Sequence, residues 1–424
     1  MNLKRSFVLF VSLLFLNLLS AEGKILTIED AVRLAKENNI SVKTAENNLD
    51  SLAVQNKYSW NSVSPAAKLN GNFEDDIDDS TAFSLSGAVN LSLKTNLYSE
   101  IKGAKLNYEK GLLTYSEAVR QIELSVRKKF YNLIYQKENL VLQNRSLETS
   151  RTQYLNNEEK FKNGKISELD AFTSRVNYES KKPLVESAEI NFQNDLATFK
   201  QLLGISQQTE IELDGSLDEI LNLKEISFGL LPKVDEPAPD VKSAEYDVEI
   251  AKNSLLNLRF SAYAPVITGS YSYGKSKKST QDDWMTTNRL SVGVSVPLDG
   301  ILPWSSSAVN IKKQKNALDT AEKVLEDAKT TVAVQTESYI RKINQAVKQL
   351  DSLKSTEKLA EQTYKMTLAA YNYGKTDFLS LQNANDSVLS AGVNLKSQAY
   401  TLISTILDLE SVLGLEFGTL ETKK

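Results

Sequence analysis

The chain has 424 residues, of which 25% are charged, and its formal net charge at pH 7 is −4. It contains no cysteine and no histidine, which excludes a disulfide framework, a Ser-His-Asp or Cys-His catalytic group and the commonest transition-metal ligands. The mildly acidic balance gives no electrostatic footprint for nucleic acid, so we expect no nucleic-acid partner, no metal and no cofactor.

The N-terminal segment, residues 1–21, is typical of a secretory signal peptide. Lys4 and Arg5 precede an apolar run over residues 7–19, and the small residues Ser20 and Ala21 follow it. The run is shorter than the ~20 residues that span a bilayer, so an N-terminal membrane anchor is the weaker alternative. We expect residues 1–21 to be removed, and we expect no transmembrane helix in the rest of the chain.

The remaining sequence contains an internal repeat, with a first copy over 22–230, a second over 231–415 and a C-terminal tail over 416–424. Matched segments keep their chain order while the offset between them rises from 199 to 210 residues, as small loop insertions would produce. The matches are Val42–Glu46 with Val241–Glu245, Ser64–Ala66 with Ala264–Val266, Leu85–Leu93 with Leu290–Leu298, Phe161–Lys165 with Tyr371–Lys375, and Leu202–Gly204 with Val412–Gly414. Pro232, Pro237 and Pro239 mark the boundary between the copies.

Each copy is predicted to run helix, strand, strand, long helix, turn, helix. The first helix is expected over about Thr27 to Tyr58, with Thr27 as its N-cap and Asp30 three residues later as a weak capping box.

Two strands are expected in each copy, at about 66–75 and 82–93 and at about 266–275 and 288–298. The second strand of each pair alternates apolar and polar residues over its whole length, a pattern typical of transmembrane β-strands of ~9–11 residues. A half-buried sheet in a soluble domain is the alternative. Four strands are too few to close a membrane barrel, which needs about eight, and an open edge in lipid leaves backbone groups unpaired. Strands in a membrane would therefore require several chains to share one barrel.

A long helical hairpin is expected after each strand pair, at about 99–204 and 304–414. Apolar residues recur every seven positions from Leu112 to Phe161 and from Ile311 to Ala360, which indicates helices that pack side by side and supercoil. Gly164 and Gly374 provide the left-handed residue at which a helix ends and the chain reverses. Heptads alone would also fit a coiled-coil rod without a pore.

From about Thr27 to Leu415, the sequence resembles the TolC family of outer-membrane efflux proteins. The resemblance rests on the aromatic-x-x-Gly turns at Phe161 to Gly164 and Tyr371 to Gly374, and on Pro65 and Pro265 at the helix-to-strand junctions. It implies a mainly α fold with a transmembrane β part, in which three chains of four strands share a 12-stranded β-barrel above a periplasmic α-helical barrel.

The resemblance also implies a periplasmic gate at the hairpin turns. Two acidic positions that ring the closed pore in some family members correspond to Ser380 and Asn383 here, which are neutral, so cation binding by such a ring is in doubt. Asp377 is nearby and could partly replace a ring carboxylate. Asp170 and Tyr371 match members of a lock between hairpins, whereas the Arg of that lock falls at Thr376, next to Lys375.

These features predict a passive duct and not an enzyme. The expected partners are two further copies of the chain, outer-membrane lipid, a periplasmic adaptor (membrane fusion) protein and an inner-membrane transporter. The adaptor is expected to contact the turns at Gly164, Lys165, Gly374 and Lys375. A secreted coiled-coil rod or adhesin is the main alternative, and an enzyme would need a pocket of convergent titratable groups that the repeat does not provide.

Overall fold

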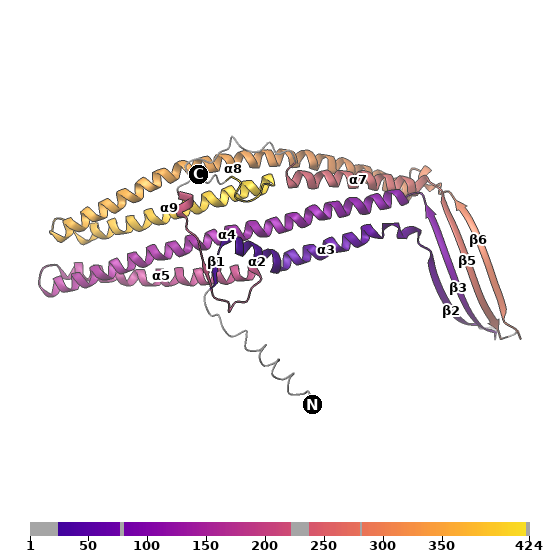
Figure 1. Ribbon diagram of the computed structural model, residues 1–424, viewed down its shortest axis with the longest axis horizontal. Coiled ribbons are helices and arrows are strands. Elements are labelled where there is room, and N and C mark those ends of the chain that lie inside the picture. The colour runs from indigo at the N-terminus through magenta and orange to yellow at the C-terminus, as the bar shows by residue number, and fades with distance from the viewer. Residues whose placement is uncertain (1–23, 77–79, 222–236, 280–281, 421–424) are drawn as a thin grey trace, which may run out of the picture. The chain divides into compact units, whose positions relative to one another are not determined.

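A computed structural model describes residues 24–76, 80–221, 237–279 and 282–420 (Figure 1). The predicted signal peptide and the proline-rich boundary at Pro232 lie outside the described residues. The elements in chain order are β1 (Lys24–Leu26), α2 (Ile28–Asn38), α3 (Ile40–Lys57), β2 (Ala66–Asp76), β3 (Ser80–Lys94), α4 (Leu97–Lys162), α5 (Glu168–Leu203), β4 (Ile211–Leu213), α6 (Asp218–Leu221), α7 (Pro239–Tyr263), β5 (Val266–Lys278), β6 (Met285–Ser295), α8 (Ser306–Asn372) and α9 (Phe378–Leu413). The predicted fold class, mainly helical with a smaller β part, is confirmed.

None of the helices in the described part of the chain has a stretch apolar and long enough to cross a membrane.

The predicted first helix is two helices, because the chain leaves the helical conformation at Asn39, whose ψ is 132°. The Asn39 side chain stabilises this break: its Nδ2 donates to the carbonyl oxygen of Leu202 at 2.8 Å, and its Oδ1 accepts the backbone N–H of Ser41 at 2.8 Å. Thr27 is the N-cap of α2 as predicted, and its Oγ1 accepts the backbone N–H of Asp30 at 3.2 Å. An asparagine that bonds to distant backbone is not distinguishable in sequence from a solvated one.

The chain forms two compact units, and each unit takes segments from both copies of the repeat. Among the described residues, one unit comprises 24–43, 118–221 and 334–420, and the other comprises 44–76, 80–117, 237–279 and 282–333. The repeat therefore does not correspond to two separately folded units.

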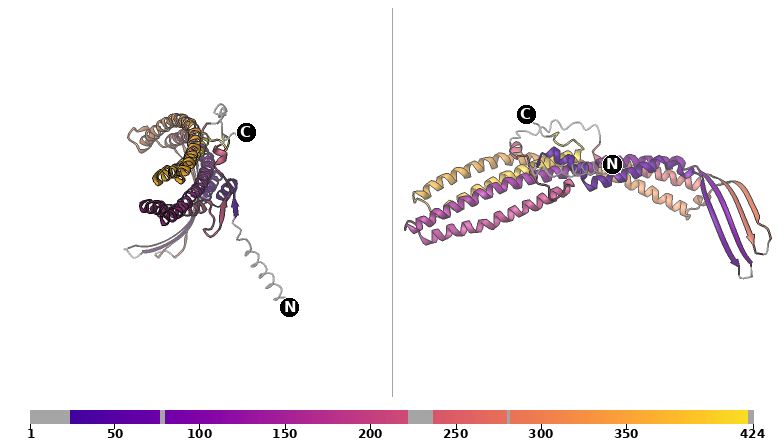
Figure 2. Two further views of the ribbon diagram at one scale, coloured as in Figure 1. Left: turned by 90° about the vertical axis from the view of Figure 1, so that its left-hand side faces the viewer. Right: turned by 60° about the horizontal axis from the view of Figure 1, so that its bottom comes forward.

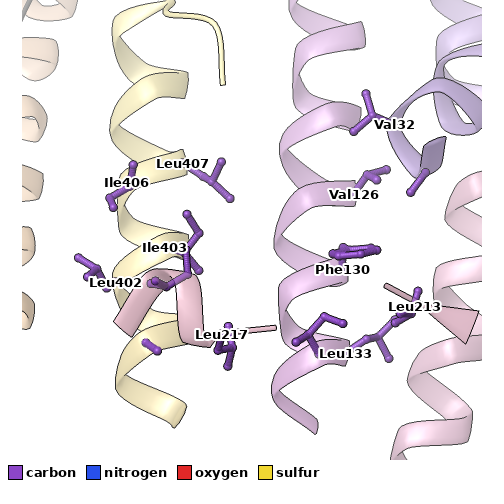
Figure 3. Close-up of a cluster of buried hydrophobic side chains, with 14 of the residues drawn as sticks. Val32, Val126, Phe130, Leu133, Leu213, Leu217, Leu402, Ile403, Ile406 and Leu407 are labelled. Atoms are coloured by element: carbon purple, nitrogen blue, oxygen red, sulfur yellow. The ribbon is translucent and has the colours of Figure 1, made fainter. Parts of the chain in front are cut away.

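The first unit contains two antiparallel helical hairpins that lie side by side, with both turns at the same end (Figures 1 and 2). One hairpin is α5 with the adjoining part of α4, and the other is α9 with the adjoining part of α8. An apolar core joins them well away from the turns. Phe130 and Leu133 of α4 belong to this core together with Leu402 and Ile403 of α9. Leu217, in the segment after β4, lies between the two helices (Figure 3). All five are at most 2% exposed, so truncating Phe130 to alanine would cost about 3–5 kcal/mol.

The C-terminal residues 415–420 belong to this core. The buried carboxylate of Glu410 accepts the backbone N–H groups of Gly418 and Leu420 at 3.0 and 2.8 Å. Burial raises the pKa of Glu410, and these two hydrogen bonds oppose the rise. The guanidinium of Arg120 lies 5.0 Å from the centre of the Phe417 ring and donates to the carbonyl oxygen of Glu410 at 2.6 Å. The segment after α9 therefore folds back and packs against the C-terminal end of that helix.

Two features fix α5 in the same unit. Gly204 ends the helix in the left-handed region, with φ 67°, and a Cβ there would lie 2.7 Å from both Cβ and the carbonyl oxygen of Asn38. Asp195 accepts hydrogen bonds from Lys129 and Gln136 of α4, and these bonds lower the pKa of the Asp195 carboxyl.

The second unit consists of α3, α7, the first parts of α4 and α8, and a four-stranded sheet. Its helices approach closely where glycine or buried amides allow it: a Cβ at Gly111 of α4 would lie 2.5 Å from a methyl of Leu52 on α3. Nδ2 of Asn253 on α7 donates to the carbonyl oxygen of Ser99 on α4 at 2.8 Å. Nδ2 of Asn96, just before α4, donates to Oδ1 of Asn257 on α7 at 2.9 Å.

Pro65 and Pro265 stand directly before β2 and β5. Proline disfavours the helical conformation of the residue before it, and Ser64 and Ala264 are extended, with ψ of 135° and 147°. The transition from helix to strand at Pro65 and at Pro265 therefore has a local cause, the proline itself.

The sheet has the order β2-β3-β5-β6, and all its neighbouring strands are antiparallel. Within the described chain, β2 and β6 each pair on one side only, so both edges are open. β6 ends at Ser295, three residues earlier than expected, just before Pro297, which lacks the N–H that a ladder requires.

The register separates the side chains into an apolar and a polar face. The row Ala67–Val89–Tyr271–Leu290 crosses all four strands on one face. Leu93, Ile267 and Val294 form a shorter row further along the same face. The opposite face carries rows of hydroxyl and amide side chains. There Oγ of Ser270 lies 2.6 Å from Oγ of Ser291.

The apolar face is open to its surroundings rather than packed on a core. On β6 the exposed fractions of Leu290, Val292 and Val294 are 75%, 76% and 67%. A soluble sheet would bury this face, so the alternative of a half-buried soluble sheet is not supported by the packing.

Candidate functional site

The two hairpin turns have the same backbone geometry. Gly164 and Gly374 have φ of 67° and 68°, the left-handed region that glycine adopts without strain. In each turn the glycine N–H donates to a carbonyl three residues back, and the following lysine N–H donates to one five residues back. These bonds are 2.8 Å from Gly164 to Phe161 and 3.0 Å from Gly374 to Tyr371. This pair of bonds is the Schellman helix end, and Lys165 and Lys375 are exposed beside it.

The second helix of each hairpin begins with a side-chain cap. The Ser167 Oγ accepts the backbone N–H of Asp170 at 3.1 Å and donates to Oδ2 of the same residue at 2.8 Å. In the other hairpin, Oδ1 of Asp377 accepts the backbone N–H of Ser380 at 2.7 Å. Hydrogen bonds from Ser380 lower the pKa of Asp377. Asp377 thus precedes α9 instead of lying on it, and its carboxylate serves as the N-cap.

Tyr371 joins the two hairpins near their turns. Its hydroxyl on α8 donates to Oδ1 of Asn157 on α4 at 2.7 Å. Burial raises the pKa of Tyr371, the bond to Asn157 opposes the rise, and the negative charge of Asp170 adds to it. Lys160 Nζ lies 4.7 Å from the ring centre, and the ring of Phe378 meets it edge to face at 6.0 Å. Asp170 and Tyr371, which the family resemblance assigns to one contact between hairpins, therefore interact electrostatically.

The other residues assigned to the gate do not form a charged cluster. Ser380 and Asn383 are exposed on α9, three residues apart and so on one face of the helix. Thr376 is half-buried, and within the described part of the chain Lys375 forms no ion pair with Asp170. The salt bridge that Lys375 could have supplied in place of the missing arginine is absent from this arrangement.

Sequence reasoning missed a buried polar stripe on α4. Near the core, α4 buries Val126 and Leu133, which belong to the predicted heptad. Toward the turn it instead buries a set of polar side chains, each at most 7% exposed: Ser146, Ser150, Gln153 and Asn157. Phe161, the last member of the predicted heptad, is 41% exposed. Ser146 and Gln153 each stand one residue before a heptad member, and Ser150 and Asn157 each stand four residues before one, so the buried stripe near the turn does not follow the apolar heptad.

The partners of this stripe come from α5 and the second hairpin. Nε2 of Gln382 on α9 donates to Oδ1 of Asn177 on α5 at 3.0 Å, and Nδ2 of Asn177 donates to Oγ of Ser150 at 3.4 Å. Closer to the core, Nζ of Lys181 lies 2.8 Å from Oδ1 of Asp386 and 3.0 Å from Oγ of Ser146. The Lys181 side chain is only 12% exposed.

The hairpins are therefore held together by apolar contacts in the middle of the unit and by hydrogen bonds toward the turns. Hydrogen bonds exchange with water at a small net cost, typically about 1 kcal/mol each, whereas separating an apolar core exposes it. Separating the hairpins at the turn end would therefore expose less apolar surface than separating them at the core. The sequence signal that could have indicated this is the recurrence of Ser, Gln and Asn at helical spacing beside the apolar heptad, at positions 146, 150, 153 and 157.

Comparison with known proteins agrees with this geometry. Residues 230–415 match the family described as outer membrane efflux protein. The outer membrane protein TolC of Vibrio cholerae is 20% identical over 306 residues, which cover 71% of this chain and 69% of that protein.

Solved structures extend the likeness to nearly the whole chain. The CmeC outer membrane channel of Campylobacter jejuni has a TM-score of 0.77 and 18% identity, covering 91% of this chain and 85% of CmeC. VceC, an outer membrane protein of Vibrio cholerae, has a TM-score of 0.73 and 13% identity, covering 92% and 96%. The open state of the MtrE outer membrane channel of Neisseria gonorrhoeae has a TM-score of 0.66 and 18% identity, covering 92% and 89%.

The predicted resemblance is thus confirmed, and the expectation that the chain is not an enzyme is confirmed with it. Residues 230–415 match the outer membrane efflux protein family, and the described chain as a whole has the fold of outer membrane channels.

Proposed function

We propose that the chain is one protomer of a trimeric channel-tunnel, a passive duct across the outer membrane that continues as a helical tunnel in the periplasm. The observation that carries the proposal is the four-stranded sheet with one exposed apolar face, one polar face and two open edges. The match of residues 230–415 to the outer membrane efflux protein family supports it.

The open edges supply the argument for several copies. An unpaired strand edge cannot lie in lipid, because its N–H and C=O groups would have no partner. With four strands per chain, β2 of one copy must pair with β6 of the next. Three copies give 12 strands, and a barrel of that size has a diameter of about 24 Å from a strand spacing of about 4.8 Å and a tilt of about 40°. The apolar face then contacts lipid and the polar face lines water.

The hairpins supply the tunnel. α4 and α8 have 66 and 67 residues, or about 100 Å at about 1.5 Å per residue. Exposed apolar side chains on α5, among them Leu169 (74%), Phe172 (55%) and Val176 (65%), provide the surface on which a neighbouring copy would pack. The exposed turns at Gly164 and Gly374 are where a periplasmic adaptor would bind, and an inner-membrane pump would supply energy and cargo.

Closure of the duct rests, in this proposal, on the polar interface near the turns. Tyr371, Asn157 and the Lys181–Asp386 pair hold the hairpins together, and opening separates them. The neutral Ser380 and Asn383 remove the acidic ring, so we expect divalent cations to block the pore only weakly.

The trimer can be tested by disulfide cross-linking, because the chain has no native cysteine. One cysteine is placed on β2 at Asn70 and a second is moved along β6, in protein that has been inserted into outer membranes. The matched control places the first cysteine at Ser86 on the inner strand β3. We expect covalent dimers and trimers with the β2 cysteine at one β6 position, and none with the β3 cysteine. Monomers at every β6 position would contradict the shared barrel.

A further inference from the structure

Two cationic side chains share one row on the polar face of the sheet. Lys68 of β2 is opposite Ala88 of β3, Ala88 is opposite Ser272 of β5, and Ser272 is opposite Arg289 of β6. Both charges are exposed. The small side chains of Ala88 and Ser272 stand between them and leave them unobstructed.

Neither charge is neutralised within the described part of the chain. Lys68 and Arg289 take part in no ion pair or side-chain hydrogen bond there. The nearest acidic position on the same face of β2 is Glu74, six residues or about 20 Å from Lys68. Glu74 has its own counter-charge, because Lys278 occupies the same row, through Ala82. The face thus carries a net positive band at the level of Lys68 and Arg289.

The rows on either side of this band are uncharged. One neighbouring row is Ala66–Asn90–Ser270–Ser291 and the other is Asn70–Ser86–Gly274–Thr287. The nearest further charge toward the helices is Lys94, which is also positive. The described acidic residues around the strand connections, Asp75, Asp282 and Asp283, lie at the opposite end of the strands.

We propose that Lys68 and Arg289 form a cationic filter in the outer-membrane part of the duct, which favours passage of anionic over cationic solutes. The inference rests on the proposed trimeric duct, in which the polar face lines the lumen. Three copies place six positive charges in a lumen about 24 Å wide between backbones, and the strand tilt spreads them over a band about 10 Å high.

The size of the effect follows from screening. A solute on the lumen axis is about 10 Å from each of the six charges, which is about one Debye length at 0.1 M salt and well inside the Debye length of about 30 Å at 0.01 M. Six weak attractions in water then add up to a preference of at least about threefold for a monovalent anion over a cation. The preference should grow as the salt concentration falls.

The test is the reversal potential of the trimer in planar bilayers under a KCl gradient, from which the chloride-to-potassium permeability ratio is obtained. The variant is Lys68→Gln with Arg289→Gln. The matched control is Lys275→Gln with Lys277→Gln, which removes the same charge from β5 on the opposite, apolar face. A third variant, Lys68→Arg with Arg289→Lys, keeps the charge and changes the side chains.

We expect the permeability ratio to fall about threefold or more in the first variant and to stay at the wild-type value in the other two, with a larger contrast at low salt. A wild-type permeability ratio in the variant with Lys68→Gln and Arg289→Gln would overturn the proposed cationic filter without contradicting the proposed duct. An equal fall in the Lys275 and Lys277 control would also overturn it, because net charge and not the row would then set the ratio. Failure of the wild-type chain to form any conducting pore would contradict the proposed duct itself.

Discussion

Replacing Tyr371 by phenylalanine removes one hydrogen bond between the hairpins and almost no volume. The bond joins the Tyr371 hydroxyl to Oδ1 of Asn157 at 2.7 Å. Asn157 is 1% exposed, and its Nδ2 has no partner in the described part of the chain. The substitution therefore leaves both polar atoms of a buried amide unsatisfied, at a cost of about 1–3 kcal/mol to the closed arrangement.

Opening removes that cost, because separated hairpins expose Asn157 to water. If the three protomers open together, even about 1 kcal/mol in each adds to about 3 kcal/mol, which raises the ratio of open to closed channels by roughly a hundredfold. The expected result is a large increase in open probability in single-channel recordings of Tyr371→Phe. Asn157→Ala should increase it too, and the double variant should show strong non-additivity.

The matched control is Tyr373→Phe. Tyr373 lies two residues away in the same turn and is 81% exposed. Its side chain forms no hydrogen bond across the hairpins in the described part of the chain, so the open probability of Tyr373→Phe should equal that of the wild type. A Tyr371→Phe channel that opens as rarely as the wild type would refute the reasoning, as would an equal effect of Tyr373→Phe.

Three further predictions concern stability, measured as the thermal midpoint of the detergent-purified protein. Gly204→Ala should cost several kcal/mol because its Cβ would meet backbone atoms, whereas Gly164→Ala, at the same φ of 67° with open space around it, should cost only about 1 kcal/mol; equal losses would be contrary to this account. Asp195→Asn should lower stability at neutral pH by about 1 kcal/mol. Because the folded pKa of Asp195 is lowered, its contribution is present above the unfolded value of 3.8 and is lost as the pH falls through the folded value, so the difference from the wild type should vanish in acid. Deleting residues 416–424 should destabilise the chain by at least about 2 kcal/mol, since the buried Glu410 loses two N–H partners, and an unchanged midpoint would argue against that anchoring.

Much of the fold was predictable because its signals are local. Proline at positions 65 and 265, alternation in the strands, and glycine at 164 and 374 each act through the backbone of adjacent residues. The break at Asn39 was not predictable, because it depends on a carbonyl of Leu202 that is distant in sequence.

The candidate site was predictable only in part. Tyr371 and Asp170 were identified, and the capping role of Asp377 follows a local rule that the sequence could have indicated. The polar interface that contains Asn157 and Lys181 was missed, since its members are buried by partners on another hairpin and a heptad count considers only apolar residues. The division of the chain into two units could not be predicted from the sequence either, because each unit combines segments of both copies of the repeat.

The central claim is that three copies close one conducting duct. The most direct test is the mass of the detergent-purified protein combined with single-channel recording of the same sample in planar bilayers. We expect a trimer that inserts and gives steady ion-conducting steps. A monomeric chain that stays soluble without detergent and never conducts would contradict it and would instead favour a coiled-coil rod.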